Sequence, residues 1–596
     1  MSTHLSMFRN VKALIGLLSS SSSHQNQRLL LRYLGTNSPS KDKTYYVTTP
    51  IFYVNAAPHI GHLYSAVTAD FLHRYKLLQG FNSKFATGTD EHGLKIQQAA
   101  DAAGKDPLTL CTEVSERFKQ LFRSCDISYT DYIRTTEERH RLAVGHFWTS
   151  LQAKGFIYKG KYEGWYSTQD ETFLTPSQVG DATDASGKDI KISLESGHKV
   201  EWMKEDNYLF RLSEFRSQLQ DWLRFNPKAV QPDRFHQAVL QWLQDDLPDL
   251  SVSRQRSRLQ WGIPVPSDPE QTIYVWLDAL VNYLTVTGYP HTHAAWWSAA
   301  HHVVGKDILK FHAIYWPAFL LAAGLPLPQS IHVHSHWTVR GKKMSKSLGN
   351  VVDPQERSQR FTVDGIRYFL LRQGVPDSDC DYDDDKVVKL LNSELADSLG
   401  GLLNRCTAPS LNPAQTYTQF WADCFPCASS GESRGRAVAE DYHMLESVAG
   451  LRAVVEQHYD NMLVYKALEA INNCVRQTNS FIQRHAPWKL DRGESGDQRW
   501  LDTILHVSLE CLRVYGTLLQ PVVPQTANKL LSRLGVKPGE RSWAHINFLE
   551  KYGERECCFE GRALGTDTGV LFSRLERPNV DKEKPKKTKK DRKQAS

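Results

Sequence analysis

Apolar residues along this chain follow two repeats, one typical of strands and one typical of helices. Residues 45–54 are rich in β-branched and aromatic side chains, and after a turn at Pro58 the apolar positions of residues 63–78 recur at helical spacing. A second strand-like run at residues 81–85 is followed by a glycine-bounded turn and a helical pattern from about Leu94. Strand, helix and strand in this order predict a parallel sheet with ligands at its carboxyl edge.

The pattern changes twice further along the chain. Residues 156–249 hold three early glycines, a polar segment and an amphipathic region rich in Trp and Phe, which predicts an inserted subdomain. The main sheet is expected to resume near Arg254, with strands at residues 273–277 and 331–336. From about residue 390 to 530 Leu, Ile and Val recur every three to four positions. We therefore predict an α/β fold followed by an all-α helix bundle.

Composition adds little, but the placement of charge is informative. The 596 residues are 41% apolar and 23% charged, as in ordinary globular proteins. The net charge is +6, yet residues 1–41 and residues 581–596 each carry +5, so the remainder is slightly acidic. A nucleic-acid surface on the folded body must therefore be a local patch. No apolar run reaches the ~18 residues of a membrane helix, so no membrane contact is expected.

The N-terminal segment has the composition of a mitochondrial presequence. Phe8 and Val11 begin an apolar helical face beside Arg9 and Lys12, a serine run follows, and acids are absent from residues 1–41. A secretory signal is the alternative, but the apolar core is short and no disulfide framework follows. We therefore expect import into the mitochondrial matrix.

Three patterns suggest metal sites at first sight. Cys424 and Cys427 form a CxxC pair, but no second pair stands at the spacing of a four-ligand zinc site. The histidines at 332, 334 and 336 alternate along a predicted strand without an evident fourth ligand. The acidic stretch 377–385 lacks the Gly and Glu that an EF-hand requires, so a solvated acidic turn before a helix is the better interpretation. We expect no structural zinc and no other resident metal.

Residues 59–62 (His-Ile-Gly-His) stand where the first strand gives way to a helix. Backbone N–H groups and the helix dipole at such a junction suit a phosphate, and His59 and His62 share one face of the first turn. Gly61 would let a flat ring such as adenine approach the backbone. Two partly buried histidines that cap an ordinary helix are the alternative. Asp90, after the second strand, would either hold an ammonium group or cap a helix.

A second candidate is the basic loop at residues 339–350, which contains Lys343 and Lys346 between two glycines. Its lysines are suited to binding a polyphosphate, although a solvated turn would have the same composition. Residues 59–62 and 343–347 (Lys-Met-Ser-Lys-Ser), followed by a helical domain, resemble the paired signatures of class I aminoacyl-tRNA synthetases. From about residue 44 to 550 the chain is similar to the methionyl-tRNA synthetases of this class, in a mitochondrial form.

The resemblance also implies roles for individual residues. The ATP-binding residues would be His59, Gly61, His62, Gly305, Asp307, Lys343 and Lys346, and the catalytic ones among them His59, His62, Lys343 and Lys346. The methionine-binding residues would be Ile51, Tyr53, Asp90, Trp276, Ala279, Tyr283, Ile308 and His312, with Asp90 on the ammonium group. Trp488 would stack on an anticodon base, unless it is a core tryptophan, and Arg405 is a further candidate for anticodon contact.

The resemblance implies a Rossmann-like catalytic domain with an inserted connective subdomain and an anticodon-binding helix bundle. The expected division is a presequence (1–43), the first half of the Rossmann domain (44–155), the insertion (156–249), the second half (250–330), the lysine loop and stem-contact region (331–390), the helical domain (391–550) and a C-terminal extension with a basic disordered tail (551–596). The implied partners are ATP with Mg²⁺, L-methionine and mitochondrial tRNA(Met), and the implied form is a monomer.

Two departures from the family pattern concern the insertion. Residues 166–170 contain no cysteine where relatives with a zinc knuckle begin their CxxC, and the insertion is short for the editing domain of the isoleucine, valine and leucine enzymes. Two other functions stay open at this point. One is a catalytically silent tRNA-binding protein derived from a synthetase, and the other is a nucleotidylyltransferase for a small metabolite, which would not need the helical domain.

Overall fold

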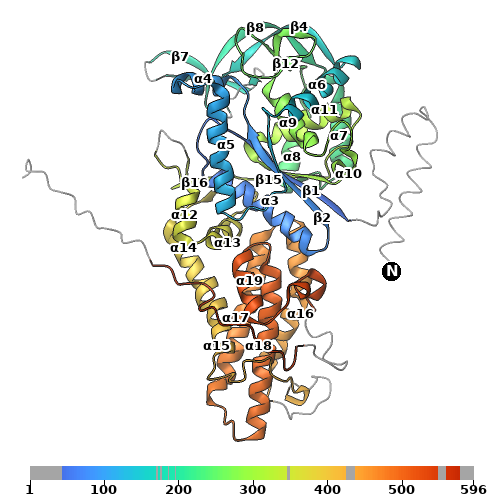
Figure 1. Cartoon of the computed structure of the whole chain (residues 1–596). Helices are drawn as coiled ribbons and strands as arrows, with labels where there is room; N and C mark the ends of the chain where they lie inside the picture. Colours follow the sequence, from blue (N-terminus) through green and yellow to red (C-terminus); the bar gives the residue numbers. More distant parts are fainter. Residues whose placement is uncertain are drawn as a thin grey trace, which may run out of the picture.

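The computed structural model describes residues 43–576 except 169–171, 175–177, 185–186, 195, 345–348, 425–435 and 548–558. The predicted presequence, apart from Lys43, and the predicted basic tail lie outside the described residues, as do Lys346 and Cys427. The described residues form a sheet-containing region and a bundle of long helices that extends away from it (Figure 1).

A six-stranded parallel sheet forms the centre of the first region, in the order β3-β2-β1-β14-β15-β9. Its strands are β1 (Thr44–Tyr53), β2 (Asn82–Asp90), β3 (Asp131–Arg134), β9 (Val230–Gln231), β14 (Ala300–Gly305) and β15 (Ser330–His334). The chain builds outward on one side of β1 and then crosses to the other, so the strand order reverses between β1 and β14. Ligands bind at the carboxyl ends of strands at such a reversal. The predicted Rossmann-like sheet is confirmed.

Helices cover both faces of this sheet, because its strands alternate apolar residues between two cores. Val47 belongs to the core under α3 and α5, whereas its neighbour Tyr46 belongs to the core under α6, α9 and α11. The helices of this region are α3 (Ile60–Leu78), α4 (Leu94–Ala103), α5 (Pro107–Ser124), α6 (Glu138–Ala153), α7 (Arg216–Phe225), α8 (Asp233–Trp242), α9 (Val275–Thr285), α10 (Ala294–Trp297), the π-helix η5 (Phe311–Tyr315) and α11 (Trp316–Ala323).

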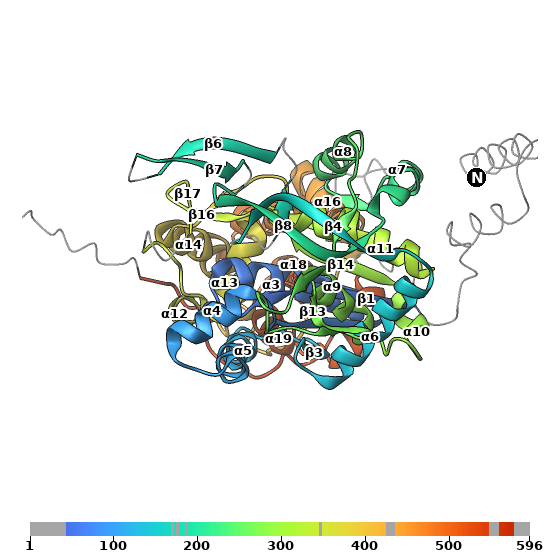
Figure 2. The same cartoon turned by 90° about the horizontal axis from the view of Figure 1, so that it is seen from above.

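The insertion forms an antiparallel sheet of its own. Its strands are β4 (Ile157–Ser167), β5 (Thr172–Leu174), β6 (Val179–Thr183), β7 (Asp189–Ser193), β8 (Lys199–Phe210) and β10 (Leu250–Ser251). Seen from above, the β6–β7 hairpin lies at one margin of the molecule (Figure 2). Strand β9, although inside residues 156–249, pairs with β15 of the central sheet.

Two strand predictions after the insertion are wrong. The residues near Arg254 form β11 (Ser253–Gln255), which with β12 (Pro264–Val265) and β13 (Asp268–Ile273) makes a separate three-stranded antiparallel sheet. The strand predicted over residues 273–277 ends at Ile273, and helix α9 begins at Val275. Most of α9 is buried, so its residues are apolar on nearly all sides. The spacing of apolar residues therefore cannot distinguish a helix from a strand here.

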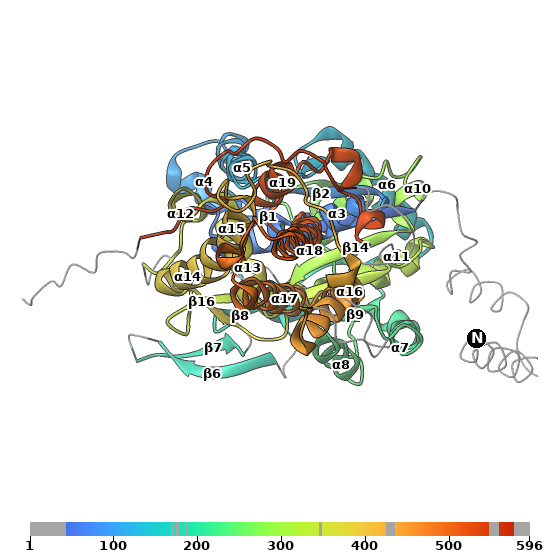
Figure 3. The same ribbon diagram turned by 90° about the horizontal axis from the view of Figure 1, so that it is seen from below.

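The predicted helix bundle is confirmed, and Figure 3 shows its long helices from below. Its elements are α12 (Pro354–Phe361), α13 (Val363–Gln373), α14 (Asp384–Leu391), the π-helix η6 (Asn392–Gly400), α15 (Gly401–Thr407), α16 (Ala439–Asp460), α17 (Val464–His485), α18 (Ser495–Leu519) and α19 (Pro524–Arg533). Asp383 caps α14, which confirms the acidic turn before a helix. Among the described helices, none has the length and apolar character needed to cross a bilayer.

Helix α3 connects the two regions. Near its C-terminal end, Tyr75 and Lys76 both donate to the Asp460 carboxylate at the end of α16. Buried Arg367 of α13 binds Asp70 of α3 and the backbone oxygen of Val522. The Arg367–Asp70 pair is buried and the Lys76–Asp460 pair lies nearer the surface, and together they attach the bundle to the helix whose other end carries His59.

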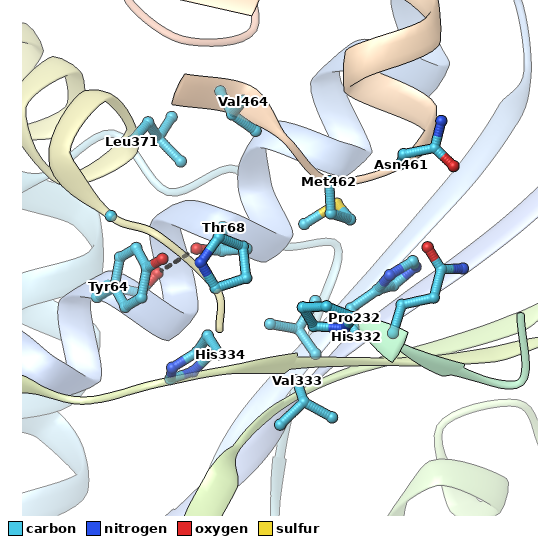
Figure 4. Close-up of a pocket in the computed structure, with 14 residues that line it drawn as sticks. Tyr64, Thr68, Pro232, His332, Val333, His334, Leu371, Asn461, Met462 and Val464 are labelled. Atoms are coloured by element: carbon cyan, nitrogen blue, oxygen red, sulfur yellow. Dashed lines mark hydrogen bonds between the residues drawn. The ribbon is translucent and has the colours of Figure 1, made fainter. Parts of the chain in front are cut away.

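A small cavity of about 30 Å³ lies at this junction, between α3, β15 and the turn that joins α16 to α17 (Figure 4). His332 and His334 both line it. Their partners differ: His332 bonds with Ser330, His334 with Ser65 (2.8 Å), and His336 with Asp307. The three histidines therefore have different partners, and within the described part of the chain they do not gather into one group of potential metal ligands.

Candidate active site

A cavity of about 420 Å³ opens at the carboxyl ends of the central strands. Five segments that are distant in the sequence meet there: the β1–α3 junction, the end of β2, helix α9, the β14–η5 segment and residues 334–344. The predicted residues that line it are Ile51, Tyr53, His59, Gly61, His62, Asp90, Trp276, Ala279, Tyr283, Gly305, Asp307, Ile308, His312 and Lys343. Lys346 lies outside the described residues, and Trp488 and Arg405 belong to the helix bundle.

The backbone fixes the orientation of His59 and His62. His59 has extended dihedrals and caps α3: its Nδ1 accepts a hydrogen bond from the Gly61 N–H (3.1 Å), and the His62 Nδ1 accepts one from the His59 N–H (3.1 Å). An imidazole nitrogen that accepts carries no proton, so a neutral ring places its hydrogen on Nε2. The two histidines therefore do cap the helix, as the predicted alternative says. The same rings also line the cavity, so the two interpretations do not exclude each other.

Both histidines are neutral at pH 7. Burial, followed by the charge of His336, lowers the pKa of His59 to about 4. Burial and the neighbouring His59 lower the pKa of His62 well below its usual value. The two rings therefore act as N–H donors and not as cations. Positive potential at this end of the cavity comes from the N-terminus of α3 and from Lys343.

Asp307 lies across the cavity with its carboxylate fixed by His336. The Asp307 Oδ1 accepts a hydrogen bond from the His336 Nε2 (3.1 Å). Burial opposes the charge, yet this bond and the His336 charge lower the pKa of Asp307 to about 2. A Cβ on Gly305 would stand 2.7 Å from the same Asp307 oxygen, so glycine is needed for this approach. In the sequence His336 belongs to an alternating histidine pattern that suggests a metal site and gives no sign of its bond to Asp307.

The opposite end of the cavity is largely aromatic. The His312 Nδ1–H donates to the Ile308 carbonyl (2.9 Å), so its Nε2 accepts the Tyr283 O–H at 2.7 Å. Burial lowers the pKa of His312 to about 4, so this ring is also neutral at pH 7. The Trp276 ring stacks on Phe311 with 3.7 Å between centroids. Phe311 was not predicted to have a role, because its only signal in the sequence is its place beside His312.

Asp90 stands at the end of β2, opposite Tyr53 in the register of β1 and β2. It is buried and lines the cavity. Helix α4 is capped by Gly93 without a side-chain bond, so the alternative that Asp90 caps a helix is wrong. A buried carboxylate beside an aromatic pocket is suited to an ammonium group.

The lysine loop begins at this cavity. Strand β17 (Lys342–Lys343) pairs with β16 (Trp337–Val339), and Asp381 holds the turn between them by accepting from the Gly341 N–H (2.9 Å). Lys343 therefore reaches the cavity wall. The first part of the loop is therefore a short hairpin beside the cavity and not a solvated turn. Residues 345–348 of the loop lie outside the described residues.

The comparisons with known proteins agree with this geometry. The family model of class I tRNA synthetases (M) matches residues 45–407, and that of the anticodon binding domain of methionyl tRNA ligase matches residues 432–576. The chain belongs to the methionyl-tRNA synthetase family. This membership places it among the class I aminoacyl-tRNA synthetases, as its two signature motifs predict.

Curated relatives and solved structures are similar over nearly the whole chain. The mitochondrial methionine–tRNA ligase of Takifugu rubripes is 73% identical over 94% of each chain, and that of Homo sapiens is 62% identical over 91% of this chain and 92% of its own. The Mycobacterium tuberculosis methionyl-tRNA synthetase in complex with methionyl-adenylate has a TM-score of 0.81 and 37% identity, covering 89% of this chain and all of its own.

In this synthetase the predicted anticodon residues lie in the bundle. Trp488 follows α17 after Ala486, whose φ of +42° turns the chain sharply, and the ring is 47% exposed, so the core alternative is wrong. Helix α17 spans 22 residues, so this corner is about 33 Å from the junction with the sheet region. Arg405 binds the Gly401 carbonyl and the side chain of Asn479, a partner that the sequence analysis missed.

Proposed function

We propose that this chain activates L-methionine with ATP and transfers the methionyl group to tRNA(Met) for translation in the mitochondrial matrix. The observation that carries the proposal is the cavity itself, which joins the start of α3, with His59, His62 and Lys343, to a largely aromatic pocket with a buried carboxylate, Asp90. Its two ends fit the two substrates of adenylation. The family membership and the 47% exposed Trp488 in the anticodon-binding region support the transfer to tRNA.

The reaction has two steps. In the first, the methionine carboxylate attacks the α-phosphate of ATP, the bond to the β-phosphate breaks and pyrophosphate leaves. In the second, a ribose hydroxyl of the terminal tRNA adenosine attacks the adenylate carbonyl and AMP leaves. Neither step needs covalent help from the protein, so positioning and charge stabilisation provide the rate.

The charged end of the cavity would hold ATP, which arrives as its Mg²⁺ complex. His59 and His62 would donate their Nε2–H groups to the phosphates, and Lys343 and Lys346 would neutralise the charge that grows on pyrophosphate. Gly61 and Gly305 would leave room for the nucleotide, with Asp307 beside its adenosine.

The aromatic end would hold methionine, with Asp90 on the ammonium group. Contacts between a thioether sulfur and aromatic rings are worth about 0.3–1.5 kcal/mol, so Trp276 and Tyr283 give a modest preference. A missing methyl group is worth only about 1–3 kcal/mol in such a pocket, which limits discrimination against homocysteine. The proposed form is a monomer.

The experiment is ATP–pyrophosphate exchange with each of the twenty amino acids, followed by aminoacylation of mitochondrial tRNA(Met). Exchange should depend on methionine, and the tRNA should become charged. Exchange that depends on a different amino acid would overturn the assignment of methionine as the substrate. Tight tRNA binding without any exchange would instead support a catalytically silent tRNA-binding protein.

A further inference from the structure

A buried carboxylate lies behind the proposed methionine pocket and takes no part in the mechanism above. Asp278, in the first turn of α9, has no exposed surface. Its Oδ2 accepts a hydrogen bond from the His92 Nδ1 and its Oδ1 one from the His140 Nε2, both at 2.7 Å. None of these three residues lines the cavity.

The two bonds join segments that carry opposite sides of the pocket. His92 is two residues after Asp90, in the turn between β2 and α4. Asp278 lies between Trp276 and Ala279 on α9, which also carries Tyr283. The carboxylate therefore connects the residue proposed for the ammonium group to the wall proposed for the methionine side chain.

Both segments depend on contacts of this kind, because neither begins with a side-chain cap. The side chain of the N-cap residue Tyr274 does not cap α9, and the N-cap of α4 is Gly93, which has no side chain. The Asp90 turn is held on its other side by Glu91, which accepts from Arg134 (2.7 Å). His140 brings in α6 as a third element, since its Nδ1 lies 3.0 Å from the Thr285 hydroxyl on α9.

The charge at the centre of this cluster is well stabilised. Burial opposes the carboxylate, but the charges and hydrogen bonds of His92 and His140 lower the pKa of Asp278 to about 2. A buried carboxylate with two short bonds tolerates little displacement, because a lost partner leaves an uncompensated charge. The distance between the Asp90 turn and α9 is therefore closely defined.

We propose that Asp278 is a positioning residue for methionine: by holding His92 against α9, it sets the spacing between Asp90 and the Trp276–Tyr283 wall. This inference rests on the proposed function of the cavity. It concerns methionine affinity and leaves the ATP end, built on α3 and β14, unaffected. Positional errors of about 1 Å in such a site are costly, so the effect should be measurable.

The test is the variant Asp278→Asn, which keeps the shape but removes the charge and one acceptor. We expect the Kd for methionine, measured by tryptophan fluorescence without ATP, and the KM for methionine in exchange to rise about 10-fold, with the KM for ATP within about 2-fold. The control is Asp70→Asn, an equally buried carboxylate that binds Arg367 and lies in α3. It should lower thermal stability without a selective change in the methionine KM.

A second pair of variants tests the bridge if Asp278→Asn folds poorly. His92→Asn keeps a donor near the position of Nδ1 and should retain most methionine affinity, whereas His92→Ala removes it and should reproduce the selective loss. Unchanged methionine affinity in folded Asp278→Asn and His92→Ala would overturn the inference. So would equal losses for methionine and ATP. Absence of methionine-dependent exchange in the unmodified protein would instead overturn the proposed function.

Discussion

The cavity proposed for adenylation and the corner that carries Trp488 present their candidate side chains in opposite ways. At the cavity, His59, His62 and His312 are largely or fully buried rings without charge, each oriented by backbone groups. At the corner, an aromatic ring is 47% exposed and the charges lie behind it. A reaction between small molecules needs a site that excludes water, whereas a base of an RNA can stack only on a ring that stands in the open.

The support behind the corner is centred on Asp441, a buried residue of α16. Its carboxylate accepts from the Val438 N–H (2.8 Å), from Arg484 and from the His485 Nε2 (2.8 Å). Arg484 and His485 are the last residues of α17, directly before the turn at Ala486. Buried charge thus fixes the backbone that carries Trp488, while at the cavity backbone N–H and C=O groups fix the neutral rings.

The largest expected effect is the acid sensitivity of the sheet region. Burial lowers the pKa of His312, His332 and His334 to about 4, below the value of about 6.5 in an unfolded chain. As the pH falls through 6.5 the unfolded chain binds protons that the folded chain does not, so their contribution is complete above pH 6.5 and is lost progressively toward pH 4. For each of these histidines, the free energy of unfolding at pH 5 should be lower than at pH 7 by on the order of 2 kcal/mol.

Chemical denaturation at pH 7, 6 and 5 measures this loss. His332→Gln removes one of these groups, so the loss of unfolding free energy between pH 7 and pH 5 should become smaller by on the order of 2 kcal/mol. His332 does not line the cavity proposed for adenylation. A free energy of unfolding that stays constant from pH 7 to 5 would show that these rings are not buried in their neutral form.

The next effect is on the rate of activation. A donor that acts mainly in the transition state is worth about 10²–10³ in rate. Lys346→Ala should therefore reduce the single-turnover rate constant of adenylate formation by that factor, with little change in ATP affinity. Rapid-quench measurement at saturating ATP tests this, with Lys342→Ala, an exposed lysine in the same loop, as the matched control. A normal rate with weaker ATP binding would contradict the role.

The sequence was sufficient for the sheet, the bundle and the meeting of most predicted residues in one cavity. The predictions of the sheet and the bundle rest on alternation and helical spacing, which are properties of contiguous residues. Most of the predicted cavity residues come instead from the resemblance to the family, which its two local motifs introduced. The prediction of a strand at residues 275–277 was wrong because α9 is buried on nearly all sides, so its apolar residues show no helical spacing. The contact of His336 could not be predicted because its partner, Asp307, follows a different strand. Phe311, Asn479 and the Asp278 cluster were missed for the same reason, since each depends on contacts between segments.

At the corner, removal of the exposed ring should separate the two regions functionally. A stacked base is worth about 1–3 kcal/mol, so Trp488→Ala should weaken tRNA binding on the order of 10- to 100-fold. Aminoacylation at limiting tRNA should fall by the same factor, while methionine-dependent ATP–pyrophosphate exchange should be unchanged. Equal losses in both assays would mean that the ring stabilises the fold and does not bind the anticodon.

The smallest expected effect is that of the support behind the ring. Asp441→Asn keeps the shape of the side chain but weakens its bonds to Arg484 and His485, so the turn before Trp488 should become less well fixed. We expect tRNA binding to weaken by about 3- to 10-fold, with exchange unaffected and a lower melting temperature. If Asp441 acts through the ring, its effect should nearly disappear in the background of Trp488→Ala, because coupled residues are not additive. Additive losses in the double variant would mean that the buried charge stabilises the bundle without positioning the base-stacking surface.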